Sequence, residues 1–311
     1  MRPAEIMITT RNKYIIYLLM GMLFSCQNQH SELIYKSDIY SLYSDRVIEG
    51  ENSATVISPT QIKSNYNSSK TENDTLPEKE WTLTLDLSKK PHYKSDQPVV
   101  DALFNMSLEE ALENIEPDST FRTGAKWSGV WTRDISYSIF LAFAYHEPEV
   151  AKISLMKKVR RDRIIQDTGS GGAWPVSSDR MIWAVAAWEI FKITGDRSWL
   201  EKVYIIIKNS LDDDYKTLYD PLTGMYRGES SFLDWREQTY PRWMSNADIF
   251  LSENLGTNVI HYEANIIVAE MARILGEPYE PYEQRAEGIR KAVNSNLWMA
   301  DKGFYAQYLY G

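Results

Sequence analysis

Beyond about residue 96, apolar positions recur with the period of a helix, and short turns separate the apolar runs. One run, over 181–191, is apolar nearly all round, which indicates a helix buried between two layers. Tight turns of the Thr194-Gly195-Asp196 type join antiparallel helices. Buried inner helices paired with more polar outer ones favour an all-α fold of the α/α toroid type. The predicted helices cover 97–115, 135–146, a segment through Val159, 181–191, 197–210, 258–275 and a last one to about Trp298.

The start of the chain predicts an export signal. Arg11 and Lys13 precede an apolar stretch of about 11 residues, too short to span a bilayer. The stretch runs into Leu-Phe-Ser-Cys, ending at Cys26, the only cysteine of the chain. This tetrapeptide resembles the lipobox of bacterial lipoproteins, in which the cysteine is lipidated and becomes the first mature residue. We therefore expect residues 1–25 to be a lipoprotein signal peptide; the alternative is a structural thiol behind an ordinary signal peptide.

Residues 26–80 are rich in Ser, Asn, Thr, Asp and Lys and show no sustained period. Such a composition buries too little apolar surface to offset chain entropy, which predicts a flexible tether. A short strand over 81–87, with period-two alternation, is expected to open the folded domain, which then covers 81–311.

The composition narrows the possible functions. A net charge of −9 argues against nucleic acid as a partner, because binding phosphates needs a basic face. The 4 His residues are scattered without the spacing of metal ligands, so we expect no metal and no cofactor. The 10 Trp and 20 Tyr residues fit either a core built from large side chains or a surface that binds carbohydrate.

The tetrapeptide Trp131-Thr132-Arg133-Asp134 opens one of the predicted helices. It places an indole, a planar cation and a carboxylate side by side, which suits a sugar ring: the indole covers an apolar face and the charged pair bonds hydroxyls. The first helical turn and the neighbouring Arg133 both favour the ionised form of Asp134. An ionised acid accepts hydrogen bonds but donates protons poorly, so we assign Arg133 and Asp134 to substrate binding. The alternative is a structural ion pair at a helix start.

A second carboxylate, Asp234, has the opposite surroundings. Phe232, Leu233 and Trp235 flank it, and partial desolvation raises the pKa of such an acid toward the range of a proton donor. We predict that Asp234 is a general acid, with Glu237 as the reserve candidate. The alternative is that Asp234 forms an ion pair with a nearby arginine.

Three segments carry a resemblance to known enzymes: 131–134, Gly172-Ala173-Trp174-Pro175-Val176-Ser177-Ser178-Asp179, and Ser230-Ser231-Phe232-Leu233-Asp234-Trp235. In this order, between helical hairpins, they resemble segments of glucoamylases, trehalases and glycogen-debranching-type glycosidases. These enzymes share the (α/α)6 barrel, or six-hairpin glycosidase fold. The resemblance implies an exported glycoside hydrolase that removes terminal, α-linked sugars from an oligosaccharide or polysaccharide, with inversion.

The same segments supply further candidates for contact with a sugar. Trp131, Trp174, Trp183 and Trp235 are candidate platforms, and Asp179 either bonds a hydroxyl or caps the helix that follows it.

The predicted helices are too few to close six hairpins, so we expect an incomplete barrel. Inverting hydrolysis also needs a base that activates water, and the resemblance places it on a Glu late in the barrel, beyond Gly311. We therefore expect an N-terminal portion of a longer enzyme, inactive by itself and lipid-anchored in the bacterial cell envelope. Two alternatives stay open: a surface lipoprotein that binds glycans without turnover, and a helical repeat protein without a sugar site.

Overall fold

The computed structural model describes residues 31–66, 79–124, 126–167, 173–229 and 240–310. The chain divides into two compact units, 1–109 and 110–311. Their boundary falls inside helix α2, Pro98–Glu113. The predicted signal peptide and Cys26 lie outside the described residues.

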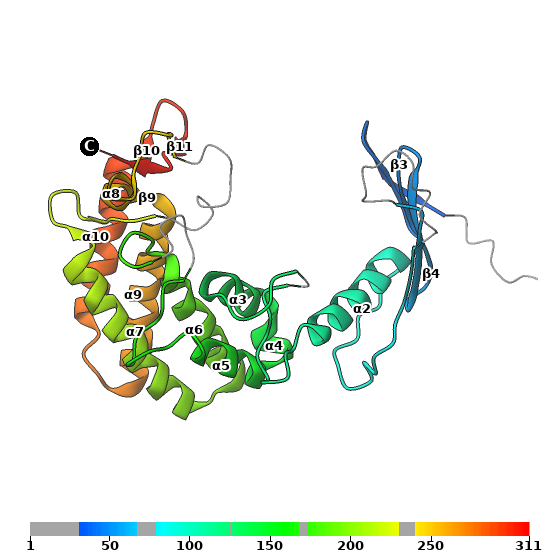
Figure 1. Cartoon of the computed structure of the whole chain (residues 1–311), viewed down its shortest axis with the longest axis horizontal. Coiled ribbons are helices and arrows are strands. Elements are labelled where there is room, and N and C mark those ends of the chain that lie inside the picture. Colours follow the sequence, from blue (N-terminus) through cyan, green and yellow to red (C-terminus); the bar gives the residue numbers. More distant parts are fainter. Residues whose placement is uncertain (1–30, 67–78, 125, 168–172, 230–239, 311) are drawn as a thin grey trace, which may run out of the picture. The chain divides into compact units, whose positions relative to one another are not determined.

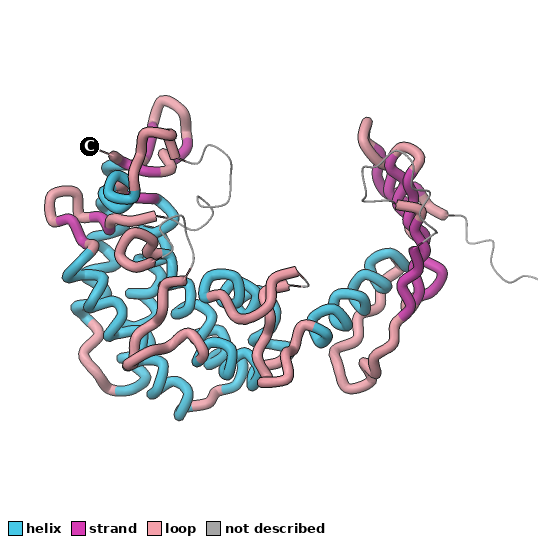
Figure 2. The backbone as a smooth tube through the Cα atoms, viewed as in Figure 1, coloured by secondary structure: helices cyan, strands magenta, loops and turns pink. Residues whose placement is uncertain are grey.

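The first unit is built on a six-stranded antiparallel sheet whose strands are neighbours in chain order (Figures 1 and 2). Its end is tied to α2 by the buried carboxylate of Glu109. That group accepts hydrogen bonds from Trp81 Nε1 at 2.7 Å and from the backbone N–H groups of Thr84 and Leu85 at 2.6 and 3.0 Å. The strands are β1 Leu33–Lys36, β2 Ser41–Tyr43, β3 Arg46–Glu49, β4 Asn52–Ser58, β5 Gln61–Ser64 and β6 Lys79–Thr82.

The sheet corrects the prediction of a tether over 26–80. Five of its strands lie between Leu33 and Ser64, within the segment predicted to be flexible. The strand predicted over 81–87 overlaps β6 only at Trp81 and Thr82, because β6 begins two residues earlier and ends at Thr82. The error has a physical reason. Consecutive hairpins satisfy their backbone groups by pairing with the next strand, so this sheet forms without the apolar alternation on which the prediction relied.

The second unit contains three helical hairpins within the described residues. In each, an inner helix is followed through a short turn by an outer one. In the first, the inner helix is interrupted by a π-helical turn, which the sequence did not predict. The hairpins are α3 Thr132–Ser138, η1 Ile139–Phe143 and α4 Ala144–His146 with α5 Pro148–Met156; η2 Asp179–Met181 and α6 Ile182–Thr194 with α7 Arg197–Thr217; and α9 Leu255–Leu275 with α10 Glu280–Asn296.

The helices sort into two layers as predicted. Helices α6 and α9 are buried along much of their length, whereas α7 and α10 bury one face and expose the other. Figure 1 shows α6, α7, α9 and α10 running alongside one another, with α9 in contact with the other three. Ile190 and Ile207 are fully buried in the core between the layers. Trp183 is buried there too, so the prediction that it could be a sugar platform is wrong: its indole has no exposed face. The hairpins and their layers are those of an α/α toroid.

The connections from outer to inner helices carry short strand pairs and one helix that the sequence did not predict. Helix α7 also extends to Thr217, beyond the predicted end at Ser210, because Asp214 in its last turns faces the interior. The added elements are β7 Tyr219–Asp220 with β8 Met225–Tyr226, α8 Asn246–Leu251, β9 Glu253–Asn254 with β12 Tyr308–Leu309, and β10 Trp298–Met299 with β11 Phe304–Tyr305.

Gly228 is the tightest point of these connections, and Gly228→Ala is expected to destabilise the fold by about 3 kcal/mol. Its φ is +110°, and a Cβ there would overlap Ser178 Oγ and lie 3.1 Å from the Val176 carbonyl oxygen. The matched control is Gly195→Ala, with φ +64° and nothing within 4 Å of the added Cβ, where only backbone strain of about 1 kcal/mol is expected. Urea denaturation of both variants gives the comparison. Equal losses would contradict the steric argument.

Candidate functional site

The first two sequence segments meet where the inner helices begin. The backbone N–H of Thr132, at the start of α3, donates to Asp167 Oδ1 at 3.0 Å. The Thr132 hydroxyl donates to the Ile165 carbonyl oxygen at 2.9 Å. The loop that leads to η2 is therefore fastened to the first turn of α3. This brings Asp179 close to the 131–134 motif.

Five residues form what we call the rim cluster: Trp131, Arg133, Asp134, Gln166 and Asp179. Arg133 Nη1 lies 3.4 Å from Asp179 Oδ2, and Arg133 Nε lies 3.9 Å from Asp134 Oδ2. Gln166 Nε2 donates to Asp179 Oδ1 at 2.5 Å. The guanidinium is thus held between two carboxylates, which fixes its plane.

The rim cluster has a buried side and an exposed side. Arg133 and Asp179 are almost fully buried, whereas the side chain of Asp134 is 27% exposed and Trp131 is 40% exposed. A ligand at this end of the helices therefore meets an indole and a carboxylate first, with the arginine behind them. The Asp179 carboxylate is turned to Arg133 and Gln166.

A second polar group lies beneath the rim cluster. We call it the Asp214 network; its members are Asp214, Arg180, Trp174 and His261. Asp214 Oδ1 accepts from Arg180 Nη2 at 2.6 Å and from Trp174 Nε1 at 2.8 Å, and Asp214 Oδ2 lies 3.1 Å from His261 Nε2. Arg180 also stands over the Trp174 ring, 5.2 Å from its centroid. Asp214 and Arg180 thereby fix the half-buried indole of Trp174.

Burial alone raises the pKa of the Asp214 carboxyl, which is completely enclosed. The charge of Arg180 and the hydrogen bonds from His261 and Trp174 outweigh that effect and hold the pKa below its ordinary value. Asp214 is therefore a buried carboxylate that stays ionised. Its hydrogen bonds anchor Arg180, which directly follows Asp179, and the indole of Trp174 in the preceding loop.

The predicted catalytic residues Asp234 and Glu237, and the platform Trp235, lie outside the described residues. Glu229, the described residue that precedes them, contacts the loop that carries Asp179. Glu229 pairs with Ser177 in a parallel bridge, and the Ser177 hydroxyl donates to Glu229 Oε2 at 2.6 Å. The described chain just before the third segment therefore lies beside the loop that carries Asp179.

Sequence reasoning missed Gln166, Arg180, Asp214 and His261. Asp214 ends a run of three aspartates that reads as a solvated helix face, and His261 has no ligand-like spacing. The only one of these four residues with a signal in the sequence was Arg180, because it directly follows the candidate Asp179. Among the described residues, no group of three or more His, Cys, Asp or Glu side chains is arranged to hold a metal ion.

Comparison with known proteins identifies the kind of domain that the second unit contains. The sequence model of the bacterial alpha-L-rhamnosidase six-hairpin glycosidase domain matches residues 164–309. No curated protein is matched in sequence. Among solved structures, the chain is similar to a sialidase, with a TM-score of 0.51 and 13% identity over 68% of this chain and 19% of that one.

Two further solved structures have lower TM-scores. One is a GH63 mannosylglycerate hydrolase from Thermus thermophilus, with a TM-score of 0.46 and 14% identity over 64% of this chain and 66% of that one. The other is a Streptomyces avermitilis alpha-L-rhamnosidase complexed with L-rhamnose, with a TM-score of 0.38 and 20% identity over 55% of this chain and 16% of that one.

The layered hairpins define a protein of the α/α toroid class, the fold predicted from the periodicity. Within that class, residues 164–309 match a six-hairpin glycosidase domain, the fold that the resemblance implied; this range includes the second and third segments but not 131–134. The chain spans 19% of the length of the sialidase that it resembles.

Asp214→Asn is expected to destabilise the protein by about 3–5 kcal/mol, because it leaves the buried Arg180 cation without its counter-charge. The neighbouring Asp213→Asn is the control. Asp213 pairs with Arg163 at 2.5 Å, but the two side chains are 31% and 45% exposed, so a change within about 1 kcal/mol is expected. Chemical denaturation at neutral pH measures both.

The pH dependence of unfolding in wild type and Asp214→Asn tests whether the ionised carboxylate is the cause of the stabilisation. The folded-state pKa of Asp214 is lowered from 3.8, so its stabilisation is present above that value and is lost as the pH falls below it. The gap in unfolding free energy between wild type and Asp214→Asn should therefore narrow below about pH 4. A gap that stays constant from pH 7 to pH 3 would contradict an ionised Asp214.

Proposed function

We propose that this chain belongs to a glycoside hydrolase that removes terminal, α-linked sugars from an oligosaccharide or polysaccharide by acid/base catalysis with inversion. The observation that carries the proposal is the rim cluster in a chain with a six-hairpin glycosidase domain. An exposed indole and a partly exposed carboxylate lie together where an inner helix begins, and a buried guanidinium contacts the carboxylate.

Each member of the rim cluster has a distinct role in this proposal. Trp131 stacks on the apolar face of the sugar ring, and Asp134 accepts hydrogen bonds from its hydroxyls. Arg133 and Asp179 are too buried to meet the sugar first, so they orient Asp134 from behind. Trp174 extends the aromatic surface on the neighbouring loop, and Trp235, outside the described residues, is a further proposed platform.

Asp234 is the proposed general acid, with Glu237 in reserve. Cleavage needs an acid that protonates the departing oxygen and a base that activates water on the opposite face of the ring. The described flank of this segment supports the assignment, because Glu229 lies beside the loop of Asp179.

The name of the matching domain favours one sugar for the first test. That domain is described as belonging to bacterial alpha-L-rhamnosidases, so α-L-rhamnosides come first, followed by α-glucosides. The fold alone does not choose between them, since function lies in the site and not in the barrel.

In the whole protein, Asp234→Asn is expected to lower kcat on alkyl α-glycosides by about 10²- to 10⁴-fold, the usual contribution of a general acid. On nitrophenyl glycosides, whose leaving group needs little protonation, the loss should be much smaller. Glu237→Gln is the matched variant and should keep most activity if Asp234 is the acid. Steady-state kinetics on both substrate types measures the pattern.

Two outcomes would reject the assignment. Near-normal turnover of alkyl glycosides by Asp234→Asn, with loss in Glu237→Gln, would move the role of acid to Glu237. Sugar binding without turnover by the wild-type protein would favour the alternative of a surface lipoprotein that binds glycans and lacks catalysis.

We further propose that the protein is exported and lipid-anchored through Cys26 in the bacterial cell envelope, in the periplasm or at the outer membrane. The support is the short apolar stretch that ends at the only cysteine. Within the described part of the chain, no helix has the length and apolarity to cross a bilayer.

Cys26→Ala is expected to abolish incorporation of radiolabelled palmitate and to shift the protein from the membrane fraction to the soluble fraction. Ser25→Ala is the control, because it changes the neighbouring residue and keeps the thiol. Labelling that persists in Cys26→Ala would show that this thiol is not the site of lipid attachment.

A further inference from the structure

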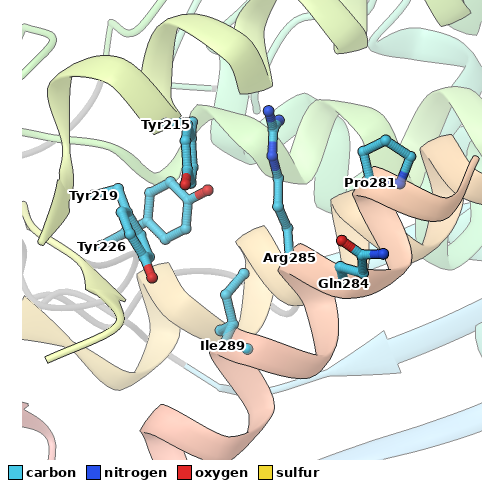
Figure 3. Close-up of a pocket in the computed structure, with 8 residues that line it drawn as sticks. Tyr215, Tyr219, Tyr226, Pro281, Gln284, Arg285 and Ile289 are labelled. Atoms are coloured by element: carbon cyan, nitrogen blue, oxygen red, sulfur yellow. The ribbon is translucent and has the colours of Figure 1, made fainter. Parts of the chain in front are cut away.

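A pocket of about 290 Å³ opens on the second unit between the end of α7, the β7–β8 hairpin and α10. Figure 3 shows tyrosines gathered on one side and polar side chains of α10 on the other. We call it the tyrosine pocket. Its lining includes Tyr215, Tyr219, Tyr226, Gln284, Arg285 and Gly288, none of which belongs to the rim cluster.

The tyrosines form a continuous aromatic wall. Tyr215 and Tyr219 are stacked with ring centroids 4.8 Å apart, and Tyr219 meets Tyr226 edge-on at 5.5 Å. Tyr226 is almost fully buried, whereas Tyr215 is 39% exposed. The wall therefore runs from the interior to the surface, and its rings are fixed by one another.

The opposite side supplies polar groups in fixed positions. The Arg285 guanidinium lies 4.3 Å from the centroid of the Tyr215 ring, and its Nη1 donates to Asp212 Oδ1 at 2.9 Å. Since Asp212 balances its charge, the guanidinium offers oriented N–H groups without a strong pull on anions. Gln284, one residue earlier on α10, is exposed and adds an amide.

Gly288 keeps the pocket open. It lies in the middle of α10, where glycine costs roughly 1 kcal/mol relative to alanine. Its backbone does not require glycine, because its φ is not among the positive ones, and a Cβ at this position meets nothing within 4 Å. The missing side chain leaves free space on the α10 side of the cavity.

We propose that the tyrosine pocket binds one neutral sugar unit of a glycan, as a site separate from the rim cluster. Flat rings match the apolar face of a pyranose, and the guanidinium, amide and phenol groups match its hydroxyls. Burial raises the pKa of the Tyr219 hydroxyl, so that group stays protonated and able to donate. The volume is near the lower end of the roughly 300–1,000 Å³ of small-molecule pockets, which suits a single ring.

Saturation-transfer NMR with three probes tests the proposal: methyl α-L-rhamnopyranoside, methyl α-D-glucopyranoside and methyl α-D-mannopyranoside. At least one should bind the wild-type chain, and Gly288→Leu, which fills the pocket, should weaken at least tenfold the binding that persists in Trp131→Ala. Lys291→Leu is the matched control, because it places the same side chain on an exposed position of α10 outside the pocket. It should bind like the wild type.

Two more variants keep the outcome decisive. Gln284→Ala removes an exposed amide with little risk to folding and should also weaken binding, with circular dichroism confirming the fold of each variant. Trp131→Ala distinguishes the two sites. Sugar binding that is lost in Trp131→Ala and retained in Gly288→Leu would overturn the proposal for the tyrosine pocket and would support the rim cluster. Absence of binding by all three probes, or binding indifferent to Gly288→Leu, would also overturn it.

Discussion

The buried charge of Asp214 constrains how the second unit packs. An ionised carboxylate inside a protein costs several kcal/mol unless its partners are in place. Here the partners come from three different segments: Arg180 from η2, Trp174 from the preceding loop and His261 from α9. The outer helix α7, the inner helix α9 and the loop of the candidate site therefore reach their final positions together.

Buried polar side chains impose a similar constraint at the start of α9. The Asn258 amide accepts from the backbone N–H of Tyr226 at 2.7 Å and donates to its carbonyl oxygen at 2.9 Å. Asn254 Nδ2 donates to the Gly228 carbonyl oxygen at 2.7 Å, and the Thr257 hydroxyl to that of Glu229 at 3.0 Å. The backbone that leads to the predicted general acid is thus held by side chains of an inner helix.

Helical periodicity predicted α6, α9 and α10 to within a few residues, because their apolar faces repeat locally along the chain. The end of α7 was missed because the compensation of Asp214 comes from Arg180 and His261, which lie 34 and 47 residues away in the sequence. The rim cluster was predicted in part: motif residues at helix starts indicated Arg133, Asp134 and Asp179, whereas Gln166 carried no signal. The sheet was missed because backbone pairing between successive hairpins needs little apolar pattern.

The tyrosine pocket and the rim cluster rest on the same buried group. The Tyr226 ring stacks on His261 at 4.3 Å, and His261 contacts Asp214. Arg180, the charge partner of Asp214, bonds through its backbone N–H to Gln166, which holds Asp179. A signal between sites needs an element with two arrangements of similar energy. The Asp214 carboxylate bonds Arg180, Trp174 and His261 at once, and any second arrangement would leave its charge uncompensated. The network therefore acts as a rigid support that holds each site in shape independently of the other.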